Sequence, residues 1–265
     1  MGNFSDQSRL VPALASLMSE AGARILDLAA KGLRGRSKPD ASVVTDADEA
    51  AEAILRAGIE RIVPGIPIVA EEAVAHGQTM AAADVFFLVD PLDGTREILA
   101  GGSDYTVNVA LVSARAPVLG LVYAPAEGAL YAGGEGRALR AKLPAGSRFA
   151  DADTRPIRAR TRPARLVAAV SRSHLDPATD AFLAGLPVAR RIQVGSAIKF
   201  CRLAEGTADV YPRLSPVHEW DAAAGHALLV AAGGSMAAPD GGPLVYGRAE
   251  KGWRIDGFVA WGAAT

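Results

Sequence analysis

Two aspartates stand close together in the stretch VDPLDGTREI, residues 89–98. Asp90 and Asp93 are separated by a proline and a leucine, and Gly94 and Thr95 follow directly. Two carboxylates about 4 Å apart repel by roughly 4 kcal/mol at an effective dielectric constant near 20. Such a pair needs a cation, a shared proton or full exposure to water. A tight surface turn is the structural alternative, because Asp, Pro and Gly are common turn residues.

The position of this stretch favours a phosphate site that also holds a metal ion. The apolar segment FFLVD predicts a strand ending at Asp90, and open α/β sheets place ligands at the carboxyl ends of strands. Asp93, Gly94 and Thr95 are expected to begin a short helix whose free backbone N–H groups hold a phosphate. Carboxylates beside a phosphate repel it, and a hard divalent cation such as Mg2+ resolves this conflict. Hydrolysis by a metal-activated water is the chemistry these residues favour.

Three other acidic segments are candidates for the same site. Glu71 and Glu72 follow the apolar stretch IPIVA, and Asp221 stands at the start of WDAAAGHAL. A solvated loop is the alternative for the glutamates, and a helix-dipole interaction worth about 0.3 to 1 kcal/mol is the alternative for Asp221. Asp48, three residues after Thr45, fits a helix capping box as well as a catalytic role. The sequence leaves both interpretations open at each position.

Several other classes of site lack their motifs. The four histidines form no metal-ligand pattern, and no G-x-S-x-G segment supports a serine nucleophile. DPLDGT is also not the D-x-D-x-T signature of an aspartyl-phosphate enzyme. Cys201 is the only cysteine, which excludes an internal disulfide and a cysteine-based zinc site. With 28 Lys and Arg against 29 Asp and Glu, the chain lacks the basic excess expected for binding nucleic-acid polymers.

The composition predicts a folded protein with a large core. Half of the 265 residues are hydrophobic, which allows one large domain or two closely packed halves. The sequence has no run of about 18 apolar residues and no N-terminal signal pattern, so we expect no transmembrane segment. The single cysteine fits a reducing, cytoplasmic setting.

Helices and strands are expected to alternate around the candidate residues. Amphipathic helices are predicted at 9–31 and from Thr45 to Pro64, joined by the polar linker GRSKPDAS. Strands follow in DVFFLVD, YTVNVALVS, PVLGLVYAP and a hairpin in GALYAGGEGRALRA. After a polar Arg/Pro-rich seam at 141–163, the predicted order is RLVAAVS (strand), PATDAFLAG (helix), SAIKFCRLAEG (helix), ADVYPR (strand) and WDAAAGHALLVAAGG (helix).

We therefore predict a layered α/β fold in two halves. The N-terminal α+β half, residues 1–150, would carry most of the candidate metal ligands. The C-terminal α/β half, residues 151–265, would carry Asp221 and further binding residues.

Three segments in this order resemble the signatures of the lithium-sensitive, Mg2+-dependent inositol monophosphatase superfamily: AEE (70–72), DPLDGT (90–95) and WDAAAGHALLVAAGG (220–234). The resemblance runs from the first predicted helix nearly to the C-terminus and implies an alternating α-β-α-β-α sandwich. A resemblance to the CysQ-type 3'(2'),5'-bisphosphate nucleotidases of this superfamily rests on SRSH (171–174), VGSAIKFC (194–201), AEGTADVYPR (204–213) and VTDAD (44–48). Ala197 replaces a second serine often found there, and HEWD (218–221) also departs from the pattern, which puts substrate preference in doubt rather than catalysis.

The resemblance implies a role for each candidate residue. It implies two or three Mg2+ ions per active site, held by Glu71, Asp90, the Leu92 carbonyl, Asp93 and Asp221. Thr95, paired with Asp48, would orient and deprotonate the attacking water, and Glu71 is counted with them as catalytic. The amides of Gly94 and Thr95 would hold the phosphate, with Asp93 and Asp221 also at the substrate.

Four further residues are candidates for the rest of a nucleotide: His174, Ser196, Lys199 and Arg213. Ser196 and Lys199 lie three residues apart at a predicted helix start, so both can face one pocket. Lys199 and Arg213 would grip a second phosphate, and His174 would touch the base or ribose. A solvated charge or a helix N-cap is the alternative at each position.

The implied activity is removal of the 3'-phosphate from adenosine 3',5'-bisphosphate, which yields AMP and clears a by-product of sulfate assimilation. An inositol-phosphate or sugar-phosphate phosphatase of the same fold is the alternative. A non-catalytic nucleotide sensor is a third hypothesis, which the complete set of acids argues against. The implied partner is a small phosphorylated nucleotide, and the family is compatible with a homodimer and with peripheral association at the inner membrane.

Overall fold

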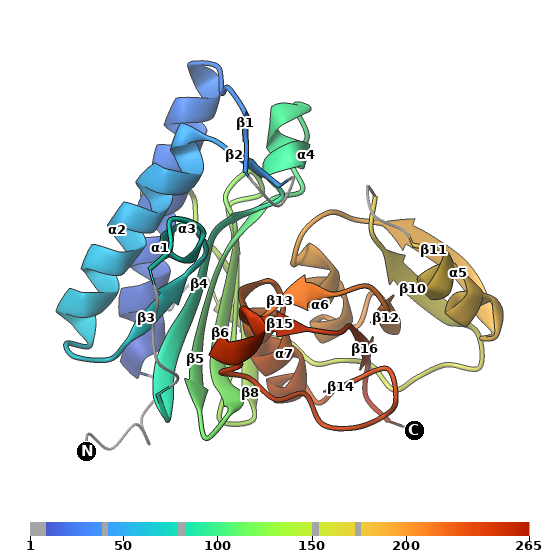
Figure 1. The fold of residues 1–265 in the computed structure, drawn as a ribbon. Helices are drawn as coiled ribbons and strands as arrows, with labels where there is room; N and C mark the ends of the chain where they lie inside the picture. The colour runs from blue at the N-terminus through green and yellow to red at the C-terminus, as the bar shows by residue number, and fades with distance from the viewer. Residues whose placement is uncertain (1–8, 39–41, 79–82, 150–153, 173–175, 265) are drawn as a thin grey trace.

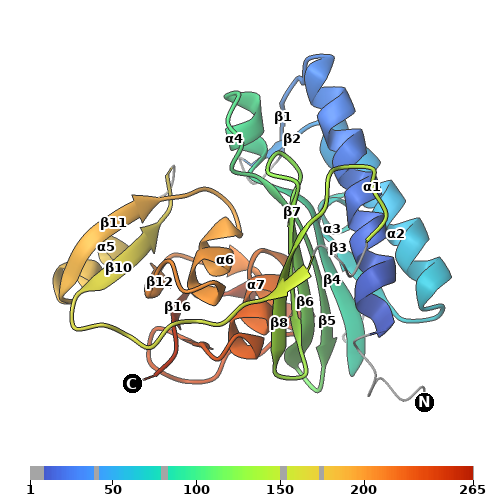
Figure 2. The same cartoon turned by 180° about the vertical axis from the view of Figure 1, so that it is seen from behind.

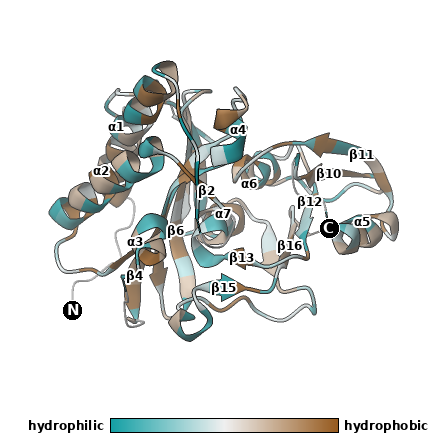
Figure 3. Cartoon of the chain, turned by 45° about the horizontal axis from the view of Figure 1, so that its top comes forward, coloured by the Kyte–Doolittle hydropathy of each residue, from teal (hydrophilic) through white to brown (hydrophobic). Residues whose placement is uncertain are grey.

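The computed structural model describes residues 9–38, 42–78, 83–149, 154–172 and 176–264. Its main elements form five layers (Figure 1). Helices α1 (Leu10–Ala30) and α2 (Asp46–Ile62) cover one face of a seven-stranded sheet. Helices α6 (Ile198–Ala204) and α7 (Glu219–Ala231) lie between that sheet and a five-stranded sheet, and α5 (Pro177–Ala184) lies on the outer side of the second sheet (Figures 1 and 3). The predicted α-β-α-β-α sandwich is confirmed.

The first sheet has the strand order β3-β4-β5-β6-β7-β8-β9. Its strands are β3 (Ile68–Ala70), β4 (Val85–Asp93), β5 (Thr106–Ser113), β6 (Ala116–Ala124), β7 (Ala129–Gly134), β8 (Arg137–Lys142) and β9 (Thr154–Pro156). Strands β3 and β4 pair in parallel, and the other neighbours are antiparallel. The ladder of β4 with β5 shifts register between Asp90 and Asp93, which face Asn108 and Thr106. An inserted residue of this kind bends a strand and re-aims its side chains.

The second sheet has the order β11-β10-β12-β16-β14. Its strands are β10 (Leu166–Val170), β11 (Val188–Gln193), β12 (Val210–Arg213), β14 (Ser235–Ala237) and β16 (Phe258–Trp261). Two short ladders join β1 (Arg36–Ser37) to β2 (Val43–Val44) and β13 (Val217–His218) to β15 (Arg254–Ile255). The remaining short helices are α3 (Glu71–Ala75), α4 (Thr95–Leu99) and the 3-10 turn η3 (Ala249–Lys251).

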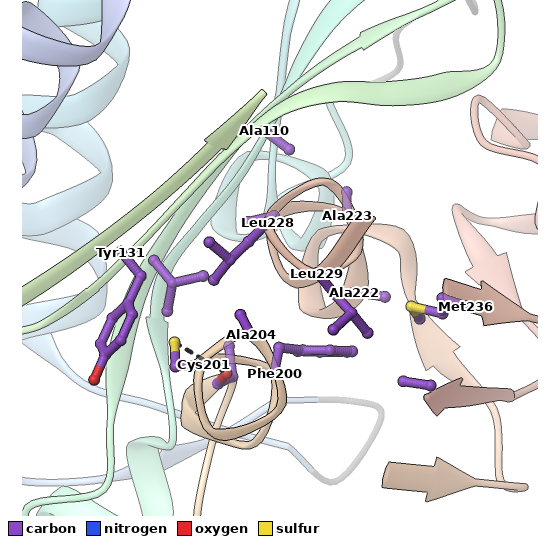
Figure 4. Packing of buried hydrophobic residues seen from close by; sticks show 14 of the residues in the cluster. Ala110, Tyr131, Phe200, Cys201, Ala204, Ala222, Ala223, Leu228, Leu229 and Met236 are labelled. Carbon is purple, nitrogen blue, oxygen red and sulfur yellow. Dashed lines mark hydrogen bonds between the residues drawn. The ribbon is translucent and has the colours of Figure 1, made fainter. Parts of the chain in front are cut away.

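Helix α7 is held between the sheets by close contacts to glycines. A Cβ on Gly133 would lie 2.6 Å from the Cα of Leu228, and one on Gly120 would lie 2.1 Å from the carbonyl oxygen of Ala224. Figure 4 shows α7 above α6, with Leu228 directed toward the first sheet and Phe200 and Cys201 of α6 below it. The Ala- and Gly-rich sequence of α7 therefore allows backbone-to-backbone approach and sets the depth of the helix.

The sequence predicted the main helices and strands β4 to β8 of the first sheet within a few residues of their observed ends, but it did not predict β3. The segment 141–163, predicted as a polar seam, also contains the end of β8 and strand β9. We predicted no helix or strand in the linker GRSKPDAS, but the linker contains the short strand β1. Within the described ranges, none of the helices combines the length and hydropathy needed to cross a bilayer.

Candidate active site

The end of β4 places the candidate ligands at the mouth of a cleft. Asp90 is buried, and its Oδ1 accepts a hydrogen bond from the Leu92 amide at 3.1 Å. Gly94 follows Asp93 with φ of +99°, and a Cβ there would lie 2.9 Å from the carbonyl oxygen of Asp104. Only glycine fits this turn without strain. The turn leads directly into the predicted short helix, α4, which begins at Thr95, whereas Asp93 still belongs to β4.

The capping role of Asp48 is confirmed, and its other carboxylate oxygen contacts Thr95 at the candidate site. Its Oδ2 accepts hydrogen bonds from the Thr45 amide at 2.8 Å and the Thr45 hydroxyl at 2.6 Å, which completes the capping box of α2. Its Oδ1 accepts a hydrogen bond from the Thr95 hydroxyl at 2.9 Å. Burial raises the pKa of Asp48, although the hydrogen bonds from both threonines oppose this effect.

Asp221 lies in the first turn of α7 and lines the cleft. Its Oδ2 accepts a hydrogen bond from the His218 amide at 2.9 Å, so it also caps the helix. Burial and then repulsion from Asp93 raise the pKa of Asp221. Burial also raises the pKa of Asp90 far above its usual range, and Glu71 and other carboxylates add to this shift. The charges of these acids therefore act on one another across the cleft.

Lys38 supplies a positive charge that the sequence analysis missed. Its ammonium lies 2.8 Å from a carboxylate oxygen of Glu71 and 2.7 Å from one of Glu72. Burial alone would lower the pKa of Lys38, but the two glutamates raise it above its usual value. Burial raises the pKa of Glu71, and Lys38 offsets part of this rise. Lys38 is the only lysine in the linker GRSKPDAS, and no motif marks it.

The donor set matches the chemistry of Mg2+. Buried carboxylates that repel one another, together with a backbone carbonyl, are oxygen ligands suited to a hard cation. Among the described residues, however, no three His, Cys, Asp or Glu side chains stand close enough together to hold a metal ion as they are. Glu71 is turned to Lys38. The residues thus fit a hard cation by type, and in this structure Lys38 pairs with Glu71.

The cleft has a volume of about 480 Å³. Its lining includes Glu71, Asp90, Leu92, Asp93, Gly94, Thr95, Ser196, Lys199, Arg213 and Asp221. Asp48 reaches this set through its hydrogen bond to Thr95. His174 lies outside the described residues.

Ser196 and Lys199 hold one loop at the cleft. Ser196 lies two residues before α6 with φ of +54°, and its hydroxyl donates to Asp93 Oδ2 at 2.7 Å. Lys199 donates to the carbonyl oxygens of Val194 at 3.2 Å and Ser196 at 2.7 Å. Burial lowers the pKa of Lys199 to about 8. Both residues line the cleft, and these hydrogen bonds hold Ser196 against Asp93 and Lys199 against the loop.

Two arginines face the other side of the cleft. Arg213 ends β12, and its Nε is buried without a hydrogen-bond partner in the described structure. Arg254 lies on β15 with its Nε 3.4 Å from His218 Nε2. The sequence analysis missed Arg254 and His218, because both belong to a two-stranded ladder formed by segments far apart in the chain.

Comparisons with known proteins identify the family of the chain. Residues 6–253 match the Inositol monophosphatase family. The chain is 37% identical over 210 residues to the 3'(2'),5'-bisphosphate nucleotidase CysQ of Escherichia coli strain K12, covering 79% of this chain and 82% of that protein. It is 38% identical over 209 residues to the protein of the same name from Buchnera aphidicola, covering 79% of this chain and 76% of that protein.

A solved structure shows the same fold. The crystal structure of CysQ from Bacteroides thetaiotaomicron, described as a bacterial member of the inositol monophosphatase family, has a TM-score of 0.79 and 31% identity. The match covers 98% of this chain and 99% of that one. Both the residues matched and the shared fold extend over nearly the whole molecule. The chain belongs to the inositol monophosphatase family.

Proposed function

We propose that this protein is a Mg2+-dependent 3'(2'),5'-bisphosphate nucleotidase that removes the 3'-phosphate from adenosine 3',5'-bisphosphate. The observation that carries the proposal is the hydrogen bond from the Thr95 hydroxyl to buried Asp48, at the edge of a cleft lined by carboxylates. The relatives named CysQ support the choice of substrate.

Asp48 and Thr95 activate the attacking water in this proposal. The Thr95 hydroxyl donates to Asp48, so its oxygen lone pairs are left to accept a hydrogen bond from a water. As that water attacks phosphorus and loses its proton to Thr95, the Thr95 proton passes to Asp48. Burial raises the pKa of Asp48 and makes it a better base than an exposed carboxylate.

The metal ligands would be Glu71, Asp90, the Leu92 carbonyl, Asp93 and Asp221, with two or three ions per site. When bound, Mg2+ supplies Lewis acidity and neutralises charge on the phosphoryl oxygens. The chain would position the reacting groups, because the Gly94 turn brings the amides of Gly94 and Thr95 to the start of α4, where they would bind the phosphate. Asp221 also lines the cleft. It would lie beside the departing ribose oxygen, which keeps the electron pair of the broken P–O bond and takes a proton from a water molecule.

The second phosphate and the nucleoside would be bound by Ser196, Lys199, Arg213 and His174. Arg213 carries a permanent charge, lines the cleft, and has a buried Nε for which the described part of the chain offers no hydrogen-bond partner. The same proposal includes a homodimer, a cytoplasmic location, sensitivity to lithium and a role in sulfate assimilation.

The variant Arg213→Ala tests the nucleotide assignment. We expect KM for adenosine 3',5'-bisphosphate to rise roughly tenfold or more, since a hydrogen bond to a charged group contributes about 1.5 to 3 kcal/mol. KM for a simple phosphate monoester should change little. Arg191→Ala, on exposed strand β11 outside the cleft, is the matched control. Equal rises in KM for both substrates would favour the inositol-phosphate or sugar-phosphate alternative.

A further inference from the structure

Glu52 is a buried carboxylate that the proposed mechanism does not use. It lies on α2, one helical turn after Asp48, and is 5% exposed. Its Oε2 accepts a hydrogen bond from the Glu72 amide at 2.7 Å, and its Oε1 accepts one from the Ala73 amide at 2.9 Å. The Arg56 guanidinium stands farther away at 3.7 Å. Both carboxylate oxygens are thus committed to the backbone of another element.

These two amides belong to the first turn of α3. The first N–H groups of a helix have no partner inside the helix and must find one elsewhere. Helix α3 is only five residues long, and its N-cap residue Ala70 provides no side-chain cap. Glu52 therefore replaces the missing cap from a different helix. Glu71 is the first residue of α3, so the same contacts fix the backbone from which its side chain projects.

Asp48 and Glu52 lie on the same face of α2, because residues four apart are neighbours on a helix. Asp48 holds the Thr95 hydroxyl at the start of α4, and Glu52 holds the start of α3. The two candidate catalytic segments are thereby attached to one rigid helix at points one turn apart. Helix α2 is itself fixed by its buried side chains Ala47, Ala51, Leu55 and Ile59.

We propose that Glu52 is a positioning residue for Glu71, and that α2 sets the distance between Glu71 and the Asp48–Thr95 pair. This inference rests on the proposed function, because it assigns Glu71 to the metal. Groups that orient metal ligands in this way typically change metal affinity or activity by about 10-fold to 100-fold when they are mutated. Glu52 acts through the backbone of α3 and does not itself contact the metal.

The test is calorimetric titration of the full-length protein with Mn2+ and Mg2+, without substrate. Glu52→Gln keeps the size of the side chain but replaces one acceptor oxygen by an N–H donor, so one amide loses its partner. Glu52→Asp keeps the charge but is too short to reach both amides. The control is Asp209→Asn, because Asp209 is also fully buried and accepts a backbone hydrogen bond, from Val167 at 2.7 Å, away from the cleft.

We expect both Glu52 variants to bind metal roughly tenfold more weakly than the wild type. Asp209→Asn should lower the melting temperature and leave metal affinity unchanged. Wild-type affinity in both Glu52 variants would overturn the inference and leave only a structural cap. Weak binding by Glu52→Gln with normal binding by Glu52→Asp would also overturn it, because charge rather than position would then matter. If the wild-type protein binds no metal, the proposed function itself fails. If the wild type binds metal and the Glu52 variants bind it equally well, only the inference about Glu52 fails, so the two failures are distinguishable.

Discussion

Asp48 uses one carboxylate oxygen for a helix cap and the other for Thr95, and we propose a catalytic task in addition to the structural one. The sequence offered a capping box and a catalytic base as alternatives, and the structure shows one oxygen on Thr45 and the other on Thr95. The three-residue spacing of Thr45 and Asp48 is enough to predict the capping box of α2. The contact with Thr95 joins residues 47 positions apart, and local spacing cannot predict it.

Asp48→Asn should separate these two tasks. The amide retains one acceptor oxygen but is a poor base, so we expect kcat to fall by about 100-fold or more. Disturbing the cap should lower the free energy of unfolding by about 1 kcal/mol. Asp176→Ala, which removes the N-cap of α5, is the control: it should cost similar stability and leave kcat unchanged. An Asp48→Asn enzyme with normal kcat would exclude Asp48 as the base.

His226 on α7 predicts a specific loss of stability in acid. Its Nδ1 lies 3.0 Å from the Tyr246 hydroxyl, and burial lowers the pKa of His226 to about 4. In the unfolded chain His226 binds a proton with its ordinary pKa near 6.5, whereas the folded protein resists this protonation. The contribution of His226 to the free energy of unfolding is therefore fully present above pH 6.5 and is lost as the pH falls toward 4. Urea unfolding from pH 7 to 4.5 should show a steeper loss for the wild type than for His226→Gln. If the free energy of unfolding falls in parallel with pH in the two proteins, His226 is not the group responsible for the loss of stability in acid.

At the scale of elements, period and composition predicted the long helices and strands β4 to β8 of the first sheet, whereas β3 and β9 were missed because each is only three residues long. Strand β11 (VARRIQ) was missed because its residues are mostly exposed and lack alternation, so its pairing with β10 defines it. Strands β14 and β16 are short and likewise depend on partners distant in sequence. Lys38 was missed for a related reason: its significance lies in a contact 33 residues away.

The close approach of α7 to the first sheet predicts that Gly133 tolerates no side chain. Gly133→Ala would place a methyl group against the α7 backbone, and overpacking of this kind costs about 1 to 3 kcal/mol. Because α7 carries Asp221, activity should fall along with the melting temperature. Gly185→Ala is the control, since the added Cβ would lie 3.5 Å from its nearest neighbour. Wild-type stability of the Gly133→Ala protein would contradict this close packing of α7 against the first sheet.

At the scale of the whole molecule, the cleft lies where segments from the two proposed halves meet. The amide of Gly195 donates to Asp104 at 2.9 Å, and Ser196 donates to Asp93. Strand β9 extends the first sheet beyond residue 150, so that sheet draws on both halves. The division of the chain at residue 150 remains a proposal. The motifs predicted which residues matter, whereas their assembly into one cleft depends on the layered packing.

The most direct test is phosphate release from adenosine 3',5'-bisphosphate, inositol 1-phosphate and fructose 1,6-bisphosphate, each with Mg2+ and with a chelator. The buried, mutually repelling carboxylates and the Asp48–Thr95 pair predict turnover that requires Mg2+. We expect kcat/KM for the nucleotide to exceed that for the other substrates by about tenfold or more, a difference of about 1.4 kcal/mol. Turnover that persists in chelator, or a preference for the inositol or sugar phosphate, would contradict the account.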